Sequence, residues 1–158
     1  MTPAASPAAL RVQAALGERF QVLEFDASTR TAADAAAAIG CTVAEIAKSL
    51  IFRGAVSNRP VLVVASGACR VDEAKVAAAV GETIARANAD FVREATGFSI
   101  RGVPPVGHTA PVASFLDEHL LDHEVVWAAA GTPRAVFSIK PADLLRVTAA
   151  ELVAVATG

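Results

Sequence analysis

The chain has 158 residues and a mass of 16.1 kDa, a length that suits one compact domain and leaves little room for two. Apolar residues make up 54% of it, yet no uninterrupted apolar run approaches the roughly 18 to 20 residues of a membrane span, so a membrane span is excluded. The net charge of −2 argues against a general nucleic-acid binder: any nucleic acid must be held locally, and no DNA partner is expected. The first residues lack the pattern of a secretory signal, which predicts a cytoplasmic location.

Two capped helices with a strand between them are predicted in the first forty residues. Ser6 followed by Pro7 places a capping residue before a proline at the first helical position, and Gly17 marks the end of that helix. Apolar and polar residues alternate over residues 21–26, which is the period-two pattern of a half-buried strand. Residues 31–40 are predicted to form an Ala-rich helix, because a Thr with an Asp three positions later begins it and a Gly ends it.

The middle of the chain is predicted to form a hairpin followed by two helices. A capping box over residues 42–45 gives a very short helix that runs into a strand over residues 48–53. A Gly/Ser/Asn turn region joins this strand to a second one over residues 61–66, so the two strands are expected to pair as a hairpin. Capping residues and closing glycines then define helices over residues 73–80 and 88–95.

Residues 98–108 form the least regular stretch, because two glycines and two prolines prevent a helix or a central strand from persisting there. Further strands are predicted at Val112 and over residues 124–129 and 135–139, and Pro141 begins a final helical region. Strands thus occur both in adjacent pairs and separated by helices. The expected fold is α/β (α+β), with a mixed, barrel-like β-sheet surrounded by helices in a single domain.

Lys48 and the loop that ends at His108 are the two features that could carry chemistry. Lys48 stands where the short helix meets an apolar strand, and its charge either anchors a phosphate or carboxylate or simply reaches solvent from a strand end. The loop over residues 97–108 either presents backbone N–H groups to an oxyanion or carbonyl, or is a plain connection. His108 is either a general base near neutral pH or a residue that packs against the loop.

Metal, disulfide and cofactor chemistry lack their usual sequence marks. Cys41 and Cys69 occur without a CxxC motif, which predicts buried thiols rather than a zinc site or a disulfide. His119 and His123 have a spacing that could bind a metal, but no third ligand is indicated. The sequence also lacks a nucleophile elbow, a Walker loop and a dinucleotide fingerprint. We therefore expect no metal and no cofactor.

Several segments together resemble the YbaK/prolyl-tRNA synthetase-associated editing domain family, which comprises free-standing and inserted aminoacyl-tRNA deacylases. The most specific parts are the Lys-Ser-Leu strand entry at residues 48–50 and the loop from Thr-Gly-Phe to Gly-x-x-Pro at residues 96–105. The resemblance spans nearly the whole chain and implies a single editing domain over residues 1–158. The segments that carry it are residues 31–40, 46–52, 70–77, 95–98, 102–107, 130–133 and 141–144.

The resemblance implies hydrolysis of the ester between a wrongly attached amino acid and the terminal adenosine of tRNA, commonly tRNA(Pro), as proofreading in trans. The implied partner is the 3′ end of an aminoacyl-tRNA, with an aminoacyl-tRNA synthetase as a further candidate. The family's lysine matches Lys48, which would neutralise a phosphate or orient the terminal nucleotide. Its glycine-proline loop matches residues 101–107, where backbone N–H groups, with Gly102 at the turn, would polarise the ester carbonyl. The implied substrate-binding residues are Thr31, Ser49, Phe98, Arg101, Val103, Pro105, His108, Ala130 and Gly131.

Two positions depart from the family pattern. Arg101 precedes Gly102 where many members have a glycine pair, so Arg101 either adds a phosphate contact or occupies a position that does not need positive φ. Ala129 stands where cysteinyl-tRNA(Pro) deacylases carry a serine, which makes cysteine a less expected substrate than alanine, 2-aminobutyrate, serine or a similar small residue. Two alternatives to hydrolysis stay open: a module that binds a tRNA end or nucleotide without turnover, and an interaction domain with a degenerate site.

Overall fold

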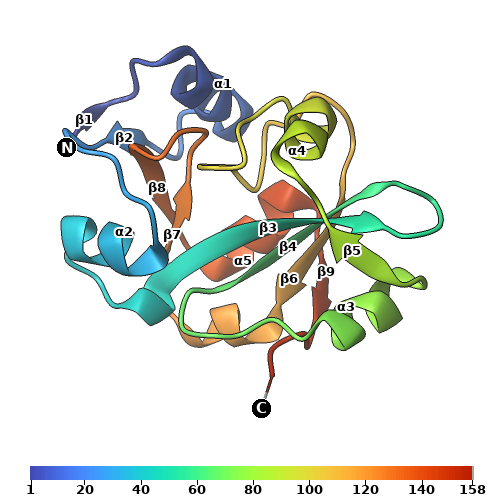
Figure 1. Cartoon of the computed structure of the whole chain (residues 1–158). Helices are drawn as coiled ribbons and strands as arrows, with labels where there is room; N and C mark the ends of the chain where they lie inside the picture. The colour runs from blue at the N-terminus through green and yellow to red at the C-terminus, as the bar shows by residue number, and fades with distance from the viewer. Residues whose placement is uncertain (158) are drawn as a thin grey trace.

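The hairpin of β3 (Ile46–Gly54) and β4 (Pro60–Ser66) forms the centre of the computed structural model, which describes residues 1–157 (Figure 1). These strands pair antiparallel over consecutive residues, as the sequence predicts. The other strands of this part of the chain are β1 (Thr2–Pro3), β2 (Val22–Glu24), β5 (Ile84–Arg86), β6 (Ala113–Asp117), β7 (Val126–Ala129), β8 (Ala135–Ile139) and β9 (Glu151–Val153).

All of these strands belong to one mixed sheet, in the order β1-β2-β8-β7-β3-β4-β6-β9, with β5 paired to β3. The parallel neighbours are β3 with β7, β4 with β6, and β6 with β9, and the other neighbours are antiparallel. The end strands β1 and β9 do not pair with each other, so the sheet stays open within the described residues. The predicted mixed sheet with surrounding helices is confirmed.

Strand β4 is buried on both faces, which explains its continuous apolar sequence. Val61 and Val63 belong to one core cluster, whereas Leu62 and Val64 belong to the other. All four side chains are fully buried. A strand covered on both sides has no solvent face, so it cannot show the alternation of a half-exposed strand.

Helices cover both faces of the sheet (Figure 1). They are α1 (Pro7–Leu16), α2 (Ala32–Ile39), α3 (Glu73–Val80), α4 (Ala89–Thr96) and α5 (Pro141–Thr148), with short 3-10 helices η1 (Val43–Glu45) and η2 (Glu118–Asp122). Val12 of α1 and Leu144 of α5 pack in one core cluster, and Val76 of α3 packs in the other. Within residues 1–157, no helix combines the length and the apolar character needed to cross a membrane.

Side-chain caps begin four of the predicted helices, α1, α2, α3 and α4. The hydroxyl of Thr31 accepts a hydrogen bond of 3.1 Å from the amide of Asp34, and the carboxylate of Asp72 accepts one of 3.0 Å from the amide of Ala74. Two expectations are wrong. Both cysteines, Cys41 and Cys69, are only partly buried, and β3 begins at Ile46, so Lys48 lies inside the strand rather than at its junction with the short helix.

Candidate active site

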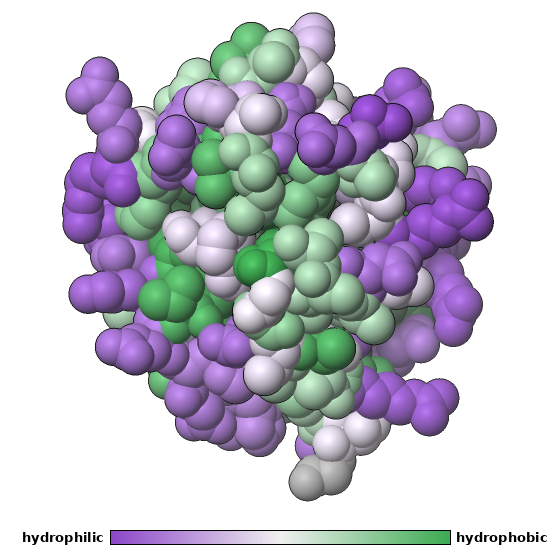
Figure 2. Space-filling model, turned by 90° about the vertical axis from the view of Figure 1, so that its left-hand side faces the viewer, coloured by the Kyte–Doolittle hydropathy of each residue, from purple (hydrophilic) through white to green (hydrophobic). Residues whose placement is uncertain are grey.

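A cavity of about 220 Å³ lies between the first half of β3 and the irregular segment after α4. Its other walls come from the start of α2, from β7 and from the turn into β8. Figure 2 shows the side of the molecule on which α2 lies, where hydrophobic surface runs between groups of hydrophilic side chains. The cavity lining includes six of the predicted site residues: Thr31, Lys48, Ser49, Arg101, Gly102 and Val103.

Lys48 is the third residue of β3, and a backbone carbonyl holds its side chain in place. Its Nζ donates a hydrogen bond of 2.6 Å to the carbonyl oxygen of Cys69, in the segment that follows β4. The backbone of Lys48 is fixed as well, because it pairs with Ala65 of β4 in the sheet. An ammonium group has three donors. Two of them therefore have no hydrogen-bond partner within the described residues.

Ser49 places a buried hydroxyl on the cavity wall. Within residues 1–157, its Oγ is the one buried side-chain polar atom without a hydrogen-bond partner. A buried hydroxyl left unpaired costs about 1–3 kcal/mol, so it calls for an explanation. Because Ser49 lines the cavity, a ligand that hydrogen-bonds to Oγ would remove this cost.

Gly102 brings the loop backbone against the turn between β7 and β8. Its φ of +99° is one that side chains rarely adopt, and a Cβ at this position would lie 2.4 Å from the carbonyl carbon of Thr132. The carbonyl oxygen of Gly102 accepts a hydrogen bond of 2.8 Å from the amide of Gly131. Arg101 does not have a positive φ, so no second glycine is required there.

The N-terminal helix α1 supports the other side of this loop. Arg11 donates a hydrogen bond of 3.1 Å to the carbonyl oxygen of Gly97, and its guanidinium lies 4.3 Å from the centre of the Phe98 ring. Phe98 itself is buried. The loop is therefore held between α1 and the β7–β8 turn.

The amides of Gly102 and Val103 are the candidate hydrogen-bond donors of the loop wall. Neither N–H group forms a hydrogen bond within the described residues, and both residues line the cavity. Fixed amide donors of this kind stabilise negative charge that develops on a carbonyl oxygen. The described lining holds no His, Cys, Asp or Glu that could activate a nucleophile. The arrangement can polarise a bound carbonyl group, but it lacks a side-chain general base.

Five predicted site residues lie outside this cavity. Phe98 and Ala130 are buried in the core cluster that includes side chains of α1. Gly131 donates its amide hydrogen bond to the loop carbonyl of Gly102. Pro105 and His108 line a separate hollow at the far end of the loop.

His108 packs against its own loop. Its Nε2 lies 2.8 Å from the carbonyl oxygen of Pro104, and its ring meets the Phe98 ring edge to face at 6.5 Å. Burial disfavours the charged imidazolium and lowers the pKa of His108 below its ordinary value, although the Pro104 carbonyl partly opposes this effect. The side chain is thus placed as a neutral packing residue of the loop.

Other lining residues were not predicted as site residues from the sequence, among them Arg30, Trp127, Thr132 and Pro133. Trp127 lies in a strand whose burial alternates. It is the chain's single tryptophan, so the sequence alone could have suggested it as a site residue. The Thr-Pro pair after a glycine is a turn signal, but only the folded sheet shows that this turn reaches the loop.

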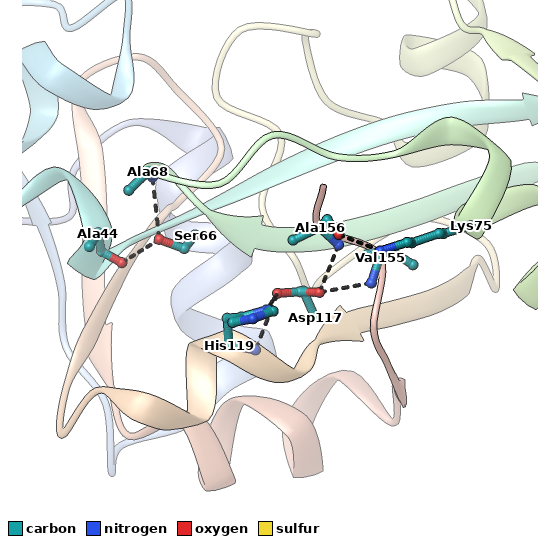
Figure 3. Close-up of polar contacts among 8 residues, drawn as sticks. All are labelled: Ala44, Ser66, Ala68, Lys75, Asp117, His119, Val155 and Ala156. Atoms are coloured by element: carbon teal, nitrogen blue, oxygen red, sulfur yellow. Dashed lines mark hydrogen bonds and ion pairs between the residues drawn. The ribbon is translucent and has the colours of Figure 1, made fainter. Parts of the chain in front are cut away.

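A second group of polar residues lies at the end of β6. The thiol of Cys69, the carboxylate of Asp117 and the ring of His119 offer ligand atoms within 4.8 Å of one another. However, the Asp117 carboxylate already accepts hydrogen bonds from the amides of Val155 and Ala156 and from both the amide and the Nδ1 of His119 (Figure 3). This hydrogen bond with Asp117 raises the pKa of His119. The group therefore ties the C-terminal segment to β6.

Comparison with known proteins identifies a family that this chain resembles. A family model for the aminoacyl-tRNA editing domain matches residues 26–147. The chain is 33% identical over 123 residues to the uncharacterized protein YwhH of Bacillus subtilis (strain 168), an alignment that covers 78% of each chain. It is also similar to the crystal structure of a candidate trans-editing enzyme for prolyl tRNA synthetase, with a TM-score of 0.92, 45% identity and coverage of 98% of this chain and 100% of the other. The hypothetical protein APE2540 has a TM-score of 0.83 and 30% identity, over 92% of this chain and 96% of the other.

Proposed function

The chain belongs to the aminoacyl-tRNA editing domain family, and from this premise we propose that it is a deacylase that removes a small, wrongly attached amino acid from tRNA(Pro) in trans. We take residues 1–158 as one editing domain. Its partner is the acylated 3′ end of the tRNA, with prolyl-tRNA synthetase as the enzyme whose errors it corrects.

One observation carries the proposal: Lys48 and the loop residues Arg101 to Val103 line the same cavity, although they are far apart in the sequence. The ester carbonyl would accept hydrogen bonds from the free amides of Gly102 and Val103. The Lys48 ammonium, fixed by the Cys69 carbonyl, would orient a phosphate or the terminal ribose. Ser49 Oγ would gain the partner that it lacks.

The reaction is a hydrolysis in which water attacks the ester carbonyl carbon. The bond between this carbon and the ribose oxygen breaks, the ribose oxygen takes a proton, and the free amino acid and the tRNA leave. Because the described lining holds no side-chain base or activated nucleophile, the protein contributes position and electrostatic stabilisation. Fixed donors of this kind account for a large share of the rate in other acyl-transfer sites.

The size of the cavity favours a short acyl group. A volume of about 220 Å³ is below the roughly 300–1,000 Å³ of pockets that enclose a whole small-molecule ligand. Ala129 contributes a methyl group to the wall where a hydroxyl would favour a polar side chain. We therefore propose alanine as the preferred amino acid, ahead of serine and cysteine.

The proposal is tested by incubating the protein with tRNA(Pro) carrying alanine, serine, cysteine or proline and measuring the amino acid released. We expect release of alanine and sparing of proline. Replacing Lys48 by Met keeps the apolar stem and removes the charge, and we expect it to lower the rate about 10²-fold, the scale of effect that misplacing a bound substrate has. Lys140→Met is the matched control, because Lys140 is exposed and lies outside the cavity.

Full activity of Lys48→Met would remove Lys48 from the mechanism. Binding of acylated tRNA without any release of amino acid would instead support the alternative of a non-hydrolytic tRNA-binding module. Circular dichroism of both variants distinguishes the removal of a charge from the loss of the fold.

A further inference from the structure

A second cavity, of about 470 Å³, adjoins the first one. The two share Ser49, Ile100 and Val103 in their linings, so they are separated only by these residues. The second cavity runs along the middle of β3 toward β5 and the start of α3. The unpartnered hydroxyl of Ser49 therefore stands at the boundary between the two spaces.

Basic residues gather around these cavities although the whole chain is acidic. The first lining contributes Arg30, Lys48 and Arg101, and the second contributes Arg70 and Arg86, against Glu73 as the acidic residue of the two linings. Within residues 1–157, the guanidinium groups of the four arginines form no hydrogen bond or ion pair. By contrast, Arg59 and Arg146 elsewhere in the chain each pair with a carboxylate. The cavity arginines are thus free to contact an external anion.

Apolar and polar surface both line the second cavity. Leu50, Phe52, Val71 and Val92 contribute apolar side chains, and Ile100, at its border with the first cavity, is 48% exposed. Apolar side chains beside guanidinium groups suit a nucleotide, because the base and sugar can cover the apolar surface while the phosphates reach the basic groups.

Both arginines of the second cavity project from fixed backbone. Arg86 pairs with Phe52 across the β3–β5 ladder. The carbonyl oxygen of Arg70 accepts a hydrogen bond of 2.8 Å from the amide of Thr157. The neighbouring segment is held by Asp117, whose carboxylate points toward the C-terminal backbone (Figure 3). Holding the backbone in this way reduces the ordering cost of a contact with a ligand.

We propose that the second cavity binds the nucleotides that precede the acylated adenosine of tRNA, with Arg70 and Arg86 contacting their phosphates. This inference rests on the proposed function, because it assumes that the acyl group occupies the adjoining cavity. It assigns the chemistry of the ester to the first cavity and recognition of the RNA backbone to the second.

The test compares two substrates, alanyl-tRNA(Pro) and alanyl-adenosine, which carries the same ester but no phosphate. The double variant Arg70→Gln, Arg86→Gln is expected to raise KM for alanyl-tRNA(Pro), to leave kcat nearly unchanged, and to leave hydrolysis of alanyl-adenosine unaffected. Arg93→Gln is the matched control, since Arg93 is exposed and lies in neither lining.

Salt dependence gives a second readout that does not require turnover. The measured quantity is the slope of the logarithm of the association constant for uncharged tRNA(Pro) against the logarithm of the salt concentration. We expect this slope to become shallower by about 0.7 for each single-strand phosphate that the protein no longer neutralises, or by about 1.4 for the double variant. An unchanged slope, or an equal loss of activity on both substrates, overturns the phosphate assignment while the hydrolytic function stands. If the wild-type protein hydrolyses neither substrate, the proposed function fails, and the slope alone decides whether the arginines bind RNA.

Discussion

Substituting Gly102 by alanine tests whether the loop backbone must approach the β7–β8 turn. Gly102 has a φ of +99°, and a Cβ there would lie 2.4 Å from the carbonyl carbon and 2.7 Å from the Cα of Thr132. These neighbours are backbone atoms, so they cannot rotate away as the end of a flexible side chain could. Gly102→Ala must therefore move the loop, the turn or both.

The loss of stability expected for Gly102→Ala is estimated by comparison with Gly81, which has a φ of +90° and no atom within 4 Å of an added Cβ. Gly81→Ala carries only the backbone cost, about 1–2 kcal/mol. At Gly102 the contact with Thr132 adds about 1–3 kcal/mol of overpacking, so we expect a total of about 2–5 kcal/mol. Displacing the Gly102 and Val103 amides should also lower kcat about 10²–10³-fold.

Urea unfolding measures the first quantity, and single-turnover deacylation of alanyl-tRNA(Pro) measures the second. Gly81→Ala should lose stability but keep its rate, because Gly81 ends α3 and is remote from the cavity lining. If Gly102→Ala is no less stable than Gly81→Ala and retains the wild-type rate, the reasoning about the loop is refuted.

Two further predictions concern the support of this loop. Arg11→Ala removes the hydrogen bond to Gly97 and the contact with the Phe98 ring. We expect the free energy of unfolding in urea to fall by about 1–2 kcal/mol and the deacylation rate to fall as well. An unchanged rate would show that α1 does not position the loop. Burial lowers the pKa of His108 in the folded state, so its contribution to stability is complete above the unfolded-state value of about 6.5 and is lost as pH falls through the folded-state value. His108→Gln should therefore flatten the dependence of the urea midpoint on pH between about 8 and 5, whereas parallel curves for both proteins would contradict this assignment.

Helix boundaries could be predicted because their causes are local. Thr31 and Asp72 begin helices by accepting hydrogen bonds from amides two or three residues later, and Gly40 and Gly81 end them in the left-handed region. Such interactions depend on the chain within one turn of the helix. A single sequence therefore contains enough information to locate them.

Three short strands depend on distant partners and were not predicted, whereas β2, which is equally short, was. β1, β5 and β9 have two or three residues each, and each is defined by a strand far away in the chain. β5, for example, forms only because Ile84 to Arg86 lie beside β3. The second cavity was not predicted for the same reason, because the pairing of β5 with β3 places Arg86 in its lining.

Lys48 and the loop could be identified from sequence, but their meeting could not be derived from it. The parallel pairing of β3 with β7 sets the β7–β8 turn beside the start of β3, and Gly102 packs on this turn. Supports for this geometry come from outside the segment that matches the family model, residues 26–147. Arg11 of α1 holds the loop, and Thr157 holds Arg70. The two cavities thus depend on both terminal segments. Arg11 fixes the loop that lines the first cavity, and Thr157 fixes the backbone of Arg70, which lines the second.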